Sequence, residues 1–172
     1  MEIRKSTLLD LPRMLELYAH ARAFMTAHGN PRQWASRNWP PESLLRADIA
    51  AGESYVCTRG AWIGAVFLFR QGRDIDPTYR VIHQGAWGWD APYGVVHRLA
   101  SDGSIPGAGS YCLRWALEQS GYLRVDTHGD NTVMQGLLNK LDFVYRGIIY
   151  VAEDNDPRLA YDRRLDGRGE ET

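Results

Sequence analysis

The sequence predicts a single mixed α/β domain, and three observations support this fold class. The chain has 172 residues, 44% of them hydrophobic, which suits one globular unit with a sizeable core. Strand-like patterns and helical spacings follow one another along its whole length. No internal repeat, low-complexity tract or linker divides the series. We therefore expect one domain over residues 1–165 and a solvated tail over 166–172.

The first part of the chain is predicted to form a strand, two helices and a hairpin. Apolar residues recur with helical spacing from Leu11 to Met25, and Asp10 is placed to cap this helix. The composition at Gly60 suits a tight turn between two strands. The predicted elements are a strand at 2–5, a helix after Asp10 that stops at 28–31, a helix from Glu42 to Gly52, and strands at 55–58 and 61–69.

The second part begins with a long irregular segment, residues 71–92, whose aromatic residues argue against disorder. The helix at 108–120 is apolar almost all round, so we expect it to be buried on both sides. The predicted elements after the irregular segment are a strand at 93–101, the helix at 108–120, a strand at 123–128, a helix at 131–141, and strands at 143–151 and 159–165. One sheet of seven strands with helices on both faces is the simplest architecture.

Charge and hydropathy exclude several classes of partner. The formal net charge is -1, and no basic stripe could follow a phosphate backbone, so nucleic acid is not expected. The charged N-terminus and an apolar run of only 60–69 argue against a signal peptide and a membrane span, which predicts a soluble cytoplasmic protein. Cys57 and Cys112 lie in apolar patterns and are expected to be small buried residues without a catalytic role.

A glycine-rich turn between the strand at 93–101 and the next helix is the main candidate for a binding site. It reads Ser-Ile-Pro-Gly-Ala-Gly-Ser over residues 104–110. Backbone N–H groups at the start of a helix bind phosphate without a charged side chain. A nucleotide-triphosphate loop would need a lysine after Gly109, and none is present. A dinucleotide-binding turn would need a third glycine, which is missing, although Asp126 and Asp130 lie near the sequence distance expected for the acidic residue of that motif. A plain tight loop is the remaining alternative.

The turn and the segment after it resemble the GNAT superfamily of acyl-CoA-dependent N-acyltransferases. The pyrophosphate motif of that family, Gln/Arg-x-x-Gly-x-Gly/Ala, aligns with residues 104–109, and its later Asn and Gly-Phe helix motif aligns with Asn131 through Asp142-Phe143. Residues 76–79, 96–101 and 126–131 look like a bacterial subgroup of this superfamily. The resemblance covers nearly the whole chain and implies a mostly antiparallel sheet of about seven strands with helices on both faces.

The resemblance also implies a cofactor, acetyl-CoA, and a reaction in which an acetyl group moves to a primary amine of a small molecule or peptide by direct attack. The implied cofactor-binding residues are Leu99, Ala100 and Ser101 for the pantetheine arm, Ile105, Gly107, Ala108, Gly109 and Ser110 for the diphosphate, and Asn131 and Met134 on the next helix. Three residues depart from the family pattern. Ser104 replaces a Gln or Arg, and Pro106 removes one N–H donor. Leu138 stands where many members keep a tyrosine that protonates the departing thiolate.

Direct transfer needs a neutral amine, so a base or a water chain must remove a proton. His97 is the leading candidate because imidazole titrates near working pH and lies beside the implied pantetheine strand. A structural histidine is the alternative. Asp126 and His128 could relay protons through water. With Asp130 they could instead bind a metal, but one histidine and two carboxylates fit a catalytic zinc site poorly, so no metal is predicted.

Tyr150 and Tyr145, in the strand that follows, are candidates for the missing acid because of their proximity in the expected order, although packing roles are common for such tyrosines. Trp34, Tyr79 and Trp87, with Trp39 and Trp89, are candidates to line the pocket of the acceptor amine, with core packing as the alternative for each. A non-catalytic acyl-CoA-binding module is the alternative function. A homodimer and a monomer both remain open.

Overall fold

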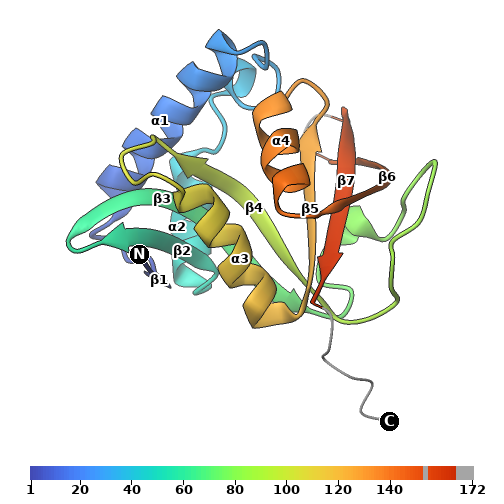
Figure 1. The fold of residues 1–172 in the computed structure, drawn as a ribbon. Helices are drawn as coiled ribbons and strands as arrows, with labels where there is room; N and C mark the ends of the chain where they lie inside the picture. Colours follow the sequence, from blue (N-terminus) through green and yellow to red (C-terminus); the bar gives the residue numbers. More distant parts are fainter. Residues whose placement is uncertain (153–154, 166–172) are drawn as a thin grey trace. The chain divides into compact units, whose positions relative to one another are not determined.

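The structure is a computed structural model that describes residues 1–152 and 155–165. Within these ranges, the order of elements agrees with the predicted order (Figure 1). The helices are α1 (Leu11–Ala27), α2 (Glu42–Ala50), α3 (Ala108–Ser120) and α4 (Thr132–Lys140), with 3-10 turns at Ala35–Arg37 and Pro77–Tyr79. The strands are β1 (Glu2–Lys5), β2 (Ser54–Arg59), β3 (Trp62–Gly72), β4 (Tyr93–Ser101), β5 (Tyr122–His128), β6 (Val144–Tyr150) and β7 (Pro157–Arg164).

The strands form a seven-stranded mixed sheet in the order β1-β2-β3-β4-β5-β7-β6. Four neighbouring pairs run antiparallel, namely β1 with β2, β2 with β3, β5 with β7 and β6 with β7. The strands β4 and β5 pair in parallel at Gly94 and Val95. The predicted fold class, a mixed and mostly antiparallel sheet of seven strands, is confirmed.

The chain forms two compact units. The first comprises Met1–Phe69 and Val96–Leu113, and the second comprises Arg70–Val95 with the chain from Arg114 onward. A single domain over 1–165 stays a prediction, and the predicted tail at 166–172 lies outside the described residues.

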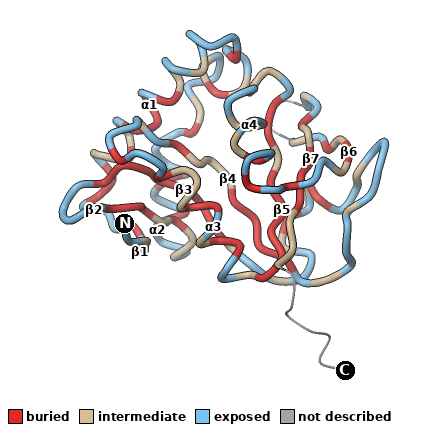
Figure 2. Tube along the Cα trace, in the orientation of Figure 1, coloured by how far each residue is buried: buried red, intermediate tan, exposed pale blue. Residues whose placement is uncertain are grey.

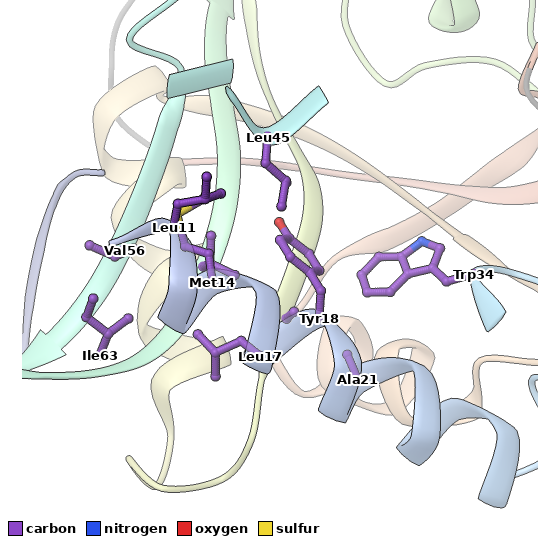
Figure 3. Packing of buried hydrophobic residues seen from close by; sticks show 11 residues of the cluster. Leu11, Met14, Leu17, Tyr18, Ala21, Trp34, Leu45, Val56 and Ile63 are labelled. Carbon is purple, nitrogen blue, oxygen red and sulfur yellow. The ribbon is translucent and has the colours of Figure 1, made fainter. Parts of the chain in front are cut away.

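The first unit has its core between α1, α2 and the strands β2 and β3. The buried side chains of α1 recur every three or four residues, which is the spacing of one helical face. Figure 3 shows this face packed toward Val56 and Ile63, with Tyr18 beside Trp34. The helix ends at Ala27 because Gly29 adopts a φ of +82°, a conformation that glycine reaches without strain.

Asp10 stands at the predicted N-cap position of α1, but its side chain makes no capping hydrogen bond. The Asp10 backbone is already helical, and its carboxylate accepts two hydrogen bonds of 2.7 Å from the Arg4 guanidinium and one of 2.8 Å from the Thr7 N–H. These bonds tie the end of β1 to the start of α1. The hydrogen bonds from Arg4 lower the pKa of Asp10 to about 2.

We expect Asp10→Asn to lower the free energy of unfolding at pH 7 by about 1 to 2 kcal/mol. A carboxyl whose folded pKa is depressed stabilises the fold above its unfolded pKa and loses that contribution as the pH falls through the folded value. The difference between the variant and the wild type should therefore shrink from about pH 4 toward pH 2 in urea titrations. Asp90→Asn, which alters a solvent-exposed pair with Arg73, is the control and should change little. A pH-independent difference would contradict the assignment.

The second unit is organised around Arg124 of β5, which is only 7% exposed. Its guanidinium lies 4.0 Å from the ring centroid of Tyr93 and 4.4 Å from that of Trp87. It also donates a hydrogen bond of 2.9 Å to the Trp89 carbonyl. Cation–π contacts of a desolvated guanidinium stabilise such packing, so Arg124 holds the irregular segment against the strands of this unit.

The long segment 71–92 is mostly exposed, yet it is anchored at several points (Figure 2). The Trp87 indole donates a hydrogen bond of 2.8 Å to the Tyr79 carbonyl. His83 and Ile148 of β6 exchange two backbone hydrogen bonds of 2.8 Å. Trp87 and the backbone of His83 thus connect this segment to the rest of the second unit.

The helix α3 is buried on one face, so the expectation of burial on both sides was wrong. Its buried residues are Ala108, Cys112, Leu113, Ala116 and Leu117. Arg114, Glu118 and Gln119 lie on the opposite face and are exposed. These polar side chains make that face a solvated one, although apolar residues stand between them in the sequence. Cys57 and Cys112 are both buried free thiols, as predicted.

Candidate functional site

The glycine turn lies in the first unit and connects β4 to α3. Gly103, Ser104, Pro106 and Gly107 are exposed, whereas Ile105 is 3% exposed and points into the core. Gly107 adopts a φ of +80°, and a Cβ placed on it would meet no atom within 4 Å. The turn is therefore an open backbone surface with one buried side chain that anchors it.

The backbone N–H groups of this turn are available to a ligand. Ala108 donates to the Ile105 carbonyl at 3.1 Å and so is already used. Across residues 1–152 and 155–165, no acceptor takes a hydrogen bond from the N–H groups of Ile105, Gly107, Gly109 or Ser110. Four free amides beside the positive end of the α3 dipole make a site suited to a diphosphate. Of the five donors predicted from the sequence, Ala108 is the one that the turn itself consumes.

Three side chains from elsewhere in the first unit hold the turn. The Trp62 indole donates to the Ser104 hydroxyl at 2.9 Å, and that hydroxyl donates to Asp102 at 2.6 Å. Arg13 of α1 forms an ion pair with Asp102, and its guanidinium lies 4.5 Å from the ring centroid of Trp62. Burial opposes ionisation of Asp102, but the bonds from Ser104 and Arg13 prevail and keep the pKa of its carboxyl below the usual value.

The predicted pantetheine strand is the end of β4. Ala100 is 3% exposed, Leu99 is half-buried and Ser101 is exposed. The half-buried His97 precedes them on the same strand. Arg98 has a φ of +53°, which is rare for a residue with a side chain inside a strand.

Asp126 of β5 lies in the second unit and is held by a tyrosine. The Tyr79 hydroxyl donates to its carboxylate at 2.6 Å. Tyr79 is 1% exposed, and burial together with the charge of Asp126 raises its pKa well above the usual value. Tyr79 is therefore a core residue that orients Asp126.

His128 at the end of β5 is 4% exposed and has both ring nitrogens engaged. The Asp130 N–H donates to Nδ1 at 3.1 Å, and the Asp130 carboxylate lies 3.5 Å from the same nitrogen, while Nε2 faces the Asp156 carboxylate at 3.3 Å. Because both ring nitrogens already have partners and the ring is buried, this arrangement favours a structural role for His128. Among the residues that the structure describes, no group of three or more His, Cys, Asp or Glu could hold a metal ion.

Asn131 caps α4, since its side chain accepts a hydrogen bond of 3.1 Å from the Met134 N–H. Met134 is half-buried in the first turn of that helix. Leu138, one turn further along, is fully buried. Asn131 and Met134, which were both predicted to bind the cofactor, therefore lie next to each other at the start of α4.

The candidate tyrosines and tryptophans differ in exposure. Tyr150 is 45% exposed and its ring lies 5.4 Å from that of His83, while Tyr145 is 47% exposed. Trp34 of the first unit is 7% exposed and packs edge-on against Tyr18. Trp87 of the second unit packs against Tyr79 and Arg124. The contacts of Trp34, Trp87 and Tyr79 are those of packing residues.

Solved structures resemble this fold over nearly its whole length. An acetyltransferase of the GNAT family from Streptococcus agalactiae 2603 is 26% identical, with 96% of each chain covered and a TM-score of 0.84. A putative acetyltransferase from Salmonella typhimurium, solved with its cofactor acetyl-CoA, is 14% identical with a TM-score of 0.60, covering 98% of this chain and 96% of the other. This chain has the GNAT fold.

A ribosomal-protein-alanine N-acetyltransferase from Brucella melitensis shares the GNAT fold at 16% identity, with a TM-score of 0.60 and coverage of 96% of this chain and 100% of the other. No protein-family model matches the chain, and no curated protein is detectably similar to it. The GNAT resemblance predicted from the sequence is confirmed. The GNAT-family acetyltransferase from Streptococcus agalactiae supports an acetyltransferase activity.

The residues that fix the glycine turn of this GNAT-fold protein were not found from the sequence. Arg13, Trp62 and Asp102 are separated by about 40 to 90 positions, and no local pattern connects them. The one local signal is Ser104, which replaces the long polar side chain of the family motif and accepts the hydrogen bond from Trp62. No helix in the described part of the chain is long and apolar enough to cross a membrane.

Proposed function

We propose that this protein is an acetyl-CoA-dependent N-acetyltransferase that acts on a primary amine of a small molecule or a peptide. The observation that carries the cofactor assignment is the open glycine turn, with four unused N–H groups and no side chain over Gly107. A diphosphate presents several acceptor oxygens, which such a set of donors fits. Cytoplasmic location stays a prediction of the sequence, and the choice between a monomer and a homodimer stays open.

The cofactor supplies the acetyl group as a thioester when it is bound. Transfer to the amine nitrogen would form a C–N bond, break the C–S bond of the thioester and release CoA as its thiolate. A proton must leave the amine nitrogen, and we assign its removal to His97, directly or through water, with Asp126 as a second candidate. A thiol with a pKa of ~8.5, the ordinary value for cysteine, is acidic enough for its thiolate to leave without an acid. The buried Leu138 at the position of the family tyrosine therefore does not prevent turnover.

Gly107→Ala tests the diphosphate site directly. The new methyl group would occupy the open side of the turn, and φ at this position is +80°, so we expect acetyl-CoA affinity to fall about tenfold or more, as measured by calorimetry. Gly103→Ala is a matched control, since Gly103 has a φ of +78° and equally open surroundings but contributes no donor to the predicted set. Equal losses of affinity in the two variants would contradict the assignment.

Turnover separates the enzyme from a non-catalytic acyl-CoA-binding module. Free thiol is measured during incubation with acetyl-CoA and a panel of small and peptide amines. We expect thiol release well above background, and His97→Ala should lower kcat at least about 100-fold while acetyl-CoA affinity is kept. Intact acetyl-CoA binding without release of the CoA thiol in the presence of any amine would favour the binding module. The absence of the family tyrosine at Leu138 is the feature that suggests such a module.

A further inference from the structure

The strand that leads into the glycine turn contains a left-handed residue, Arg98, held by two buried side chains. Arg98 has a φ of +53°, and a single such residue in a strand changes the direction of the backbone that follows. Leu99, Ala100 and Ser101 follow it immediately and run into the turn. The direction of this segment therefore depends on how firmly the bend at Arg98 is held.

Tyr18 and Asp48 supply the two contacts that hold the bend. The Tyr18 hydroxyl, on α1, donates a hydrogen bond of 2.9 Å to the Arg98 carbonyl. The Arg98 guanidinium donates a bond of 2.6 Å to the carboxylate of Asp48 on α2. All three residues belong to the first unit. One contact restrains the backbone of the bend and the other restrains its side chain.

Burial makes both contacts strong. Tyr18 is 2% exposed, and the side chains of Arg98 and Asp48 are 14% and 11% exposed, so little water competes with them. The Arg98 Nε is buried and has no hydrogen-bond partner in the described part of the chain. Asp48 therefore provides the carboxylate that compensates for the burial of this guanidinium. A left-handed arginine persists only where its surroundings determine its conformation to this degree.

We propose that Tyr18 and Asp48 are positioning residues for the cofactor, which together hold the bend at Arg98 and so aim the backbone of residues 99–101 at the pantetheine arm. This inference rests on the proposed function. Neither side chain touches the cofactor or the reacting atoms in this scheme. Their effect is transmitted through Arg98 to the strand, whereas the diphosphate is bound by the turn beyond it.

The test compares two probes, acetyl-CoA and adenosine 3′-phosphate 5′-diphosphate, which has the nucleotide and diphosphate but lacks the pantetheine arm. Tyr18→Phe keeps the ring that packs on Trp34 and removes only the hydroxyl. We expect it to weaken acetyl-CoA binding by about 3- to 10-fold, and Asp48→Asn by about tenfold or more. Both variants should bind the pantetheine-free probe within about twofold of the wild type.

Kinetics and a rescue variant provide the further readouts. The KM for acetyl-CoA should rise in both variants, while kcat at saturating acetyl-CoA stays within about twofold, because no reacting group is changed. Adding Arg98→Gly to Asp48→Asn should restore most of the acetyl-CoA affinity, since glycine adopts the bend without strain and the buried guanidinium is gone. Tyr161→Phe, a buried tyrosine of the second unit, is the control and should change neither affinity.

Equal weakening of both probes, or weakening of neither, would overturn the positioning role. A double variant that binds acetyl-CoA as poorly as Asp48→Asn would overturn it as well, because restoring the bend would then have no effect. If the wild type binds neither probe, the proposed function itself fails. That result is distinct, because it is obtained before any variant is made.

Discussion

Asp162→Asn should lower the free energy of unfolding by about 3 to 5 kcal/mol, the largest loss of stability that we expect from a single polar substitution in this protein. The Asp162 carboxylate on β7 is fully buried and accepts three hydrogen bonds. Arg146 Nε and the Tyr122 hydroxyl each donate at 2.7 Å, and the Gly88 N–H donates at 2.8 Å. An amide at this position would turn one acceptor into a donor that faces these donors, and would leave Arg146 without a compensating charge.

Thermal and urea unfolding measure this loss, and the midpoint temperature should fall by about 10 °C or more. Asp142→Asn is the matched control, because Asp142 is 82% exposed and lies 3.8 Å from Arg163, so its contribution is expected to be small. Since Gly88 belongs to the irregular segment, the Asp162 variant should also increase proteolysis within 71–92. A midpoint within a degree of the control would show that the carboxylate network contributes nothing to stability.

Gly64→Ala should disrupt the glycine turn from beneath and reduce kcat/KM for acetyl-CoA by about 100-fold. A Cβ on Gly64 of β3 would lie 2.5–2.8 Å from three atoms of Ile105, including its Cβ, so Ile105 has to move. Ile105 is the one buried side chain of residues 103–107 in the turn. Its displacement shifts the neighbouring amides by a fraction of an ångström or more, which weakens several charge-assisted hydrogen bonds to a diphosphate together.

Gly136→Ala is the control for this variant. Gly136 lies in α4 with no atom within 4 Å of an added Cβ, and alanine in an exposed helix position should stabilise the protein by about 0.5 to 1 kcal/mol. Affinity for acetyl-CoA should be unchanged in that control. A Gly64→Ala variant that binds acetyl-CoA and adenosine 3′-phosphate 5′-diphosphate as tightly as the wild type would show that Ile105 does not position the turn.

The regular elements could be predicted because their signals are local. The strand β4 and the helix α3 have the predicted bounds, since a change from strand-like to helical spacing across a glycine turn is visible within about 30 residues. Two local expectations did not hold in full, because Asp10 stands at the N-cap of α1 without a side-chain cap and α3 is buried on one face only. The Asp10 carboxylate bonds to Arg4 instead of the helix N-terminus. The polar residues of α3 form an exposed face, which became evident only from the burial of each residue in the fold.

The sequence by itself determined the order of the elements, the place of the glycine turn and the resemblance that names acetyl-CoA as its ligand. Each of these depends on residue types at short spacing, which backbone chemistry translates directly into structure. Only the tertiary structure decided what holds that turn and the strand before it. Arg13, Trp62 and Asp102 fix the turn, and Tyr18 and Asp48 fix the bend at Arg98. Such contacts join residues far apart in the chain, and burial sets their strength, so no spacing along the sequence could have revealed them.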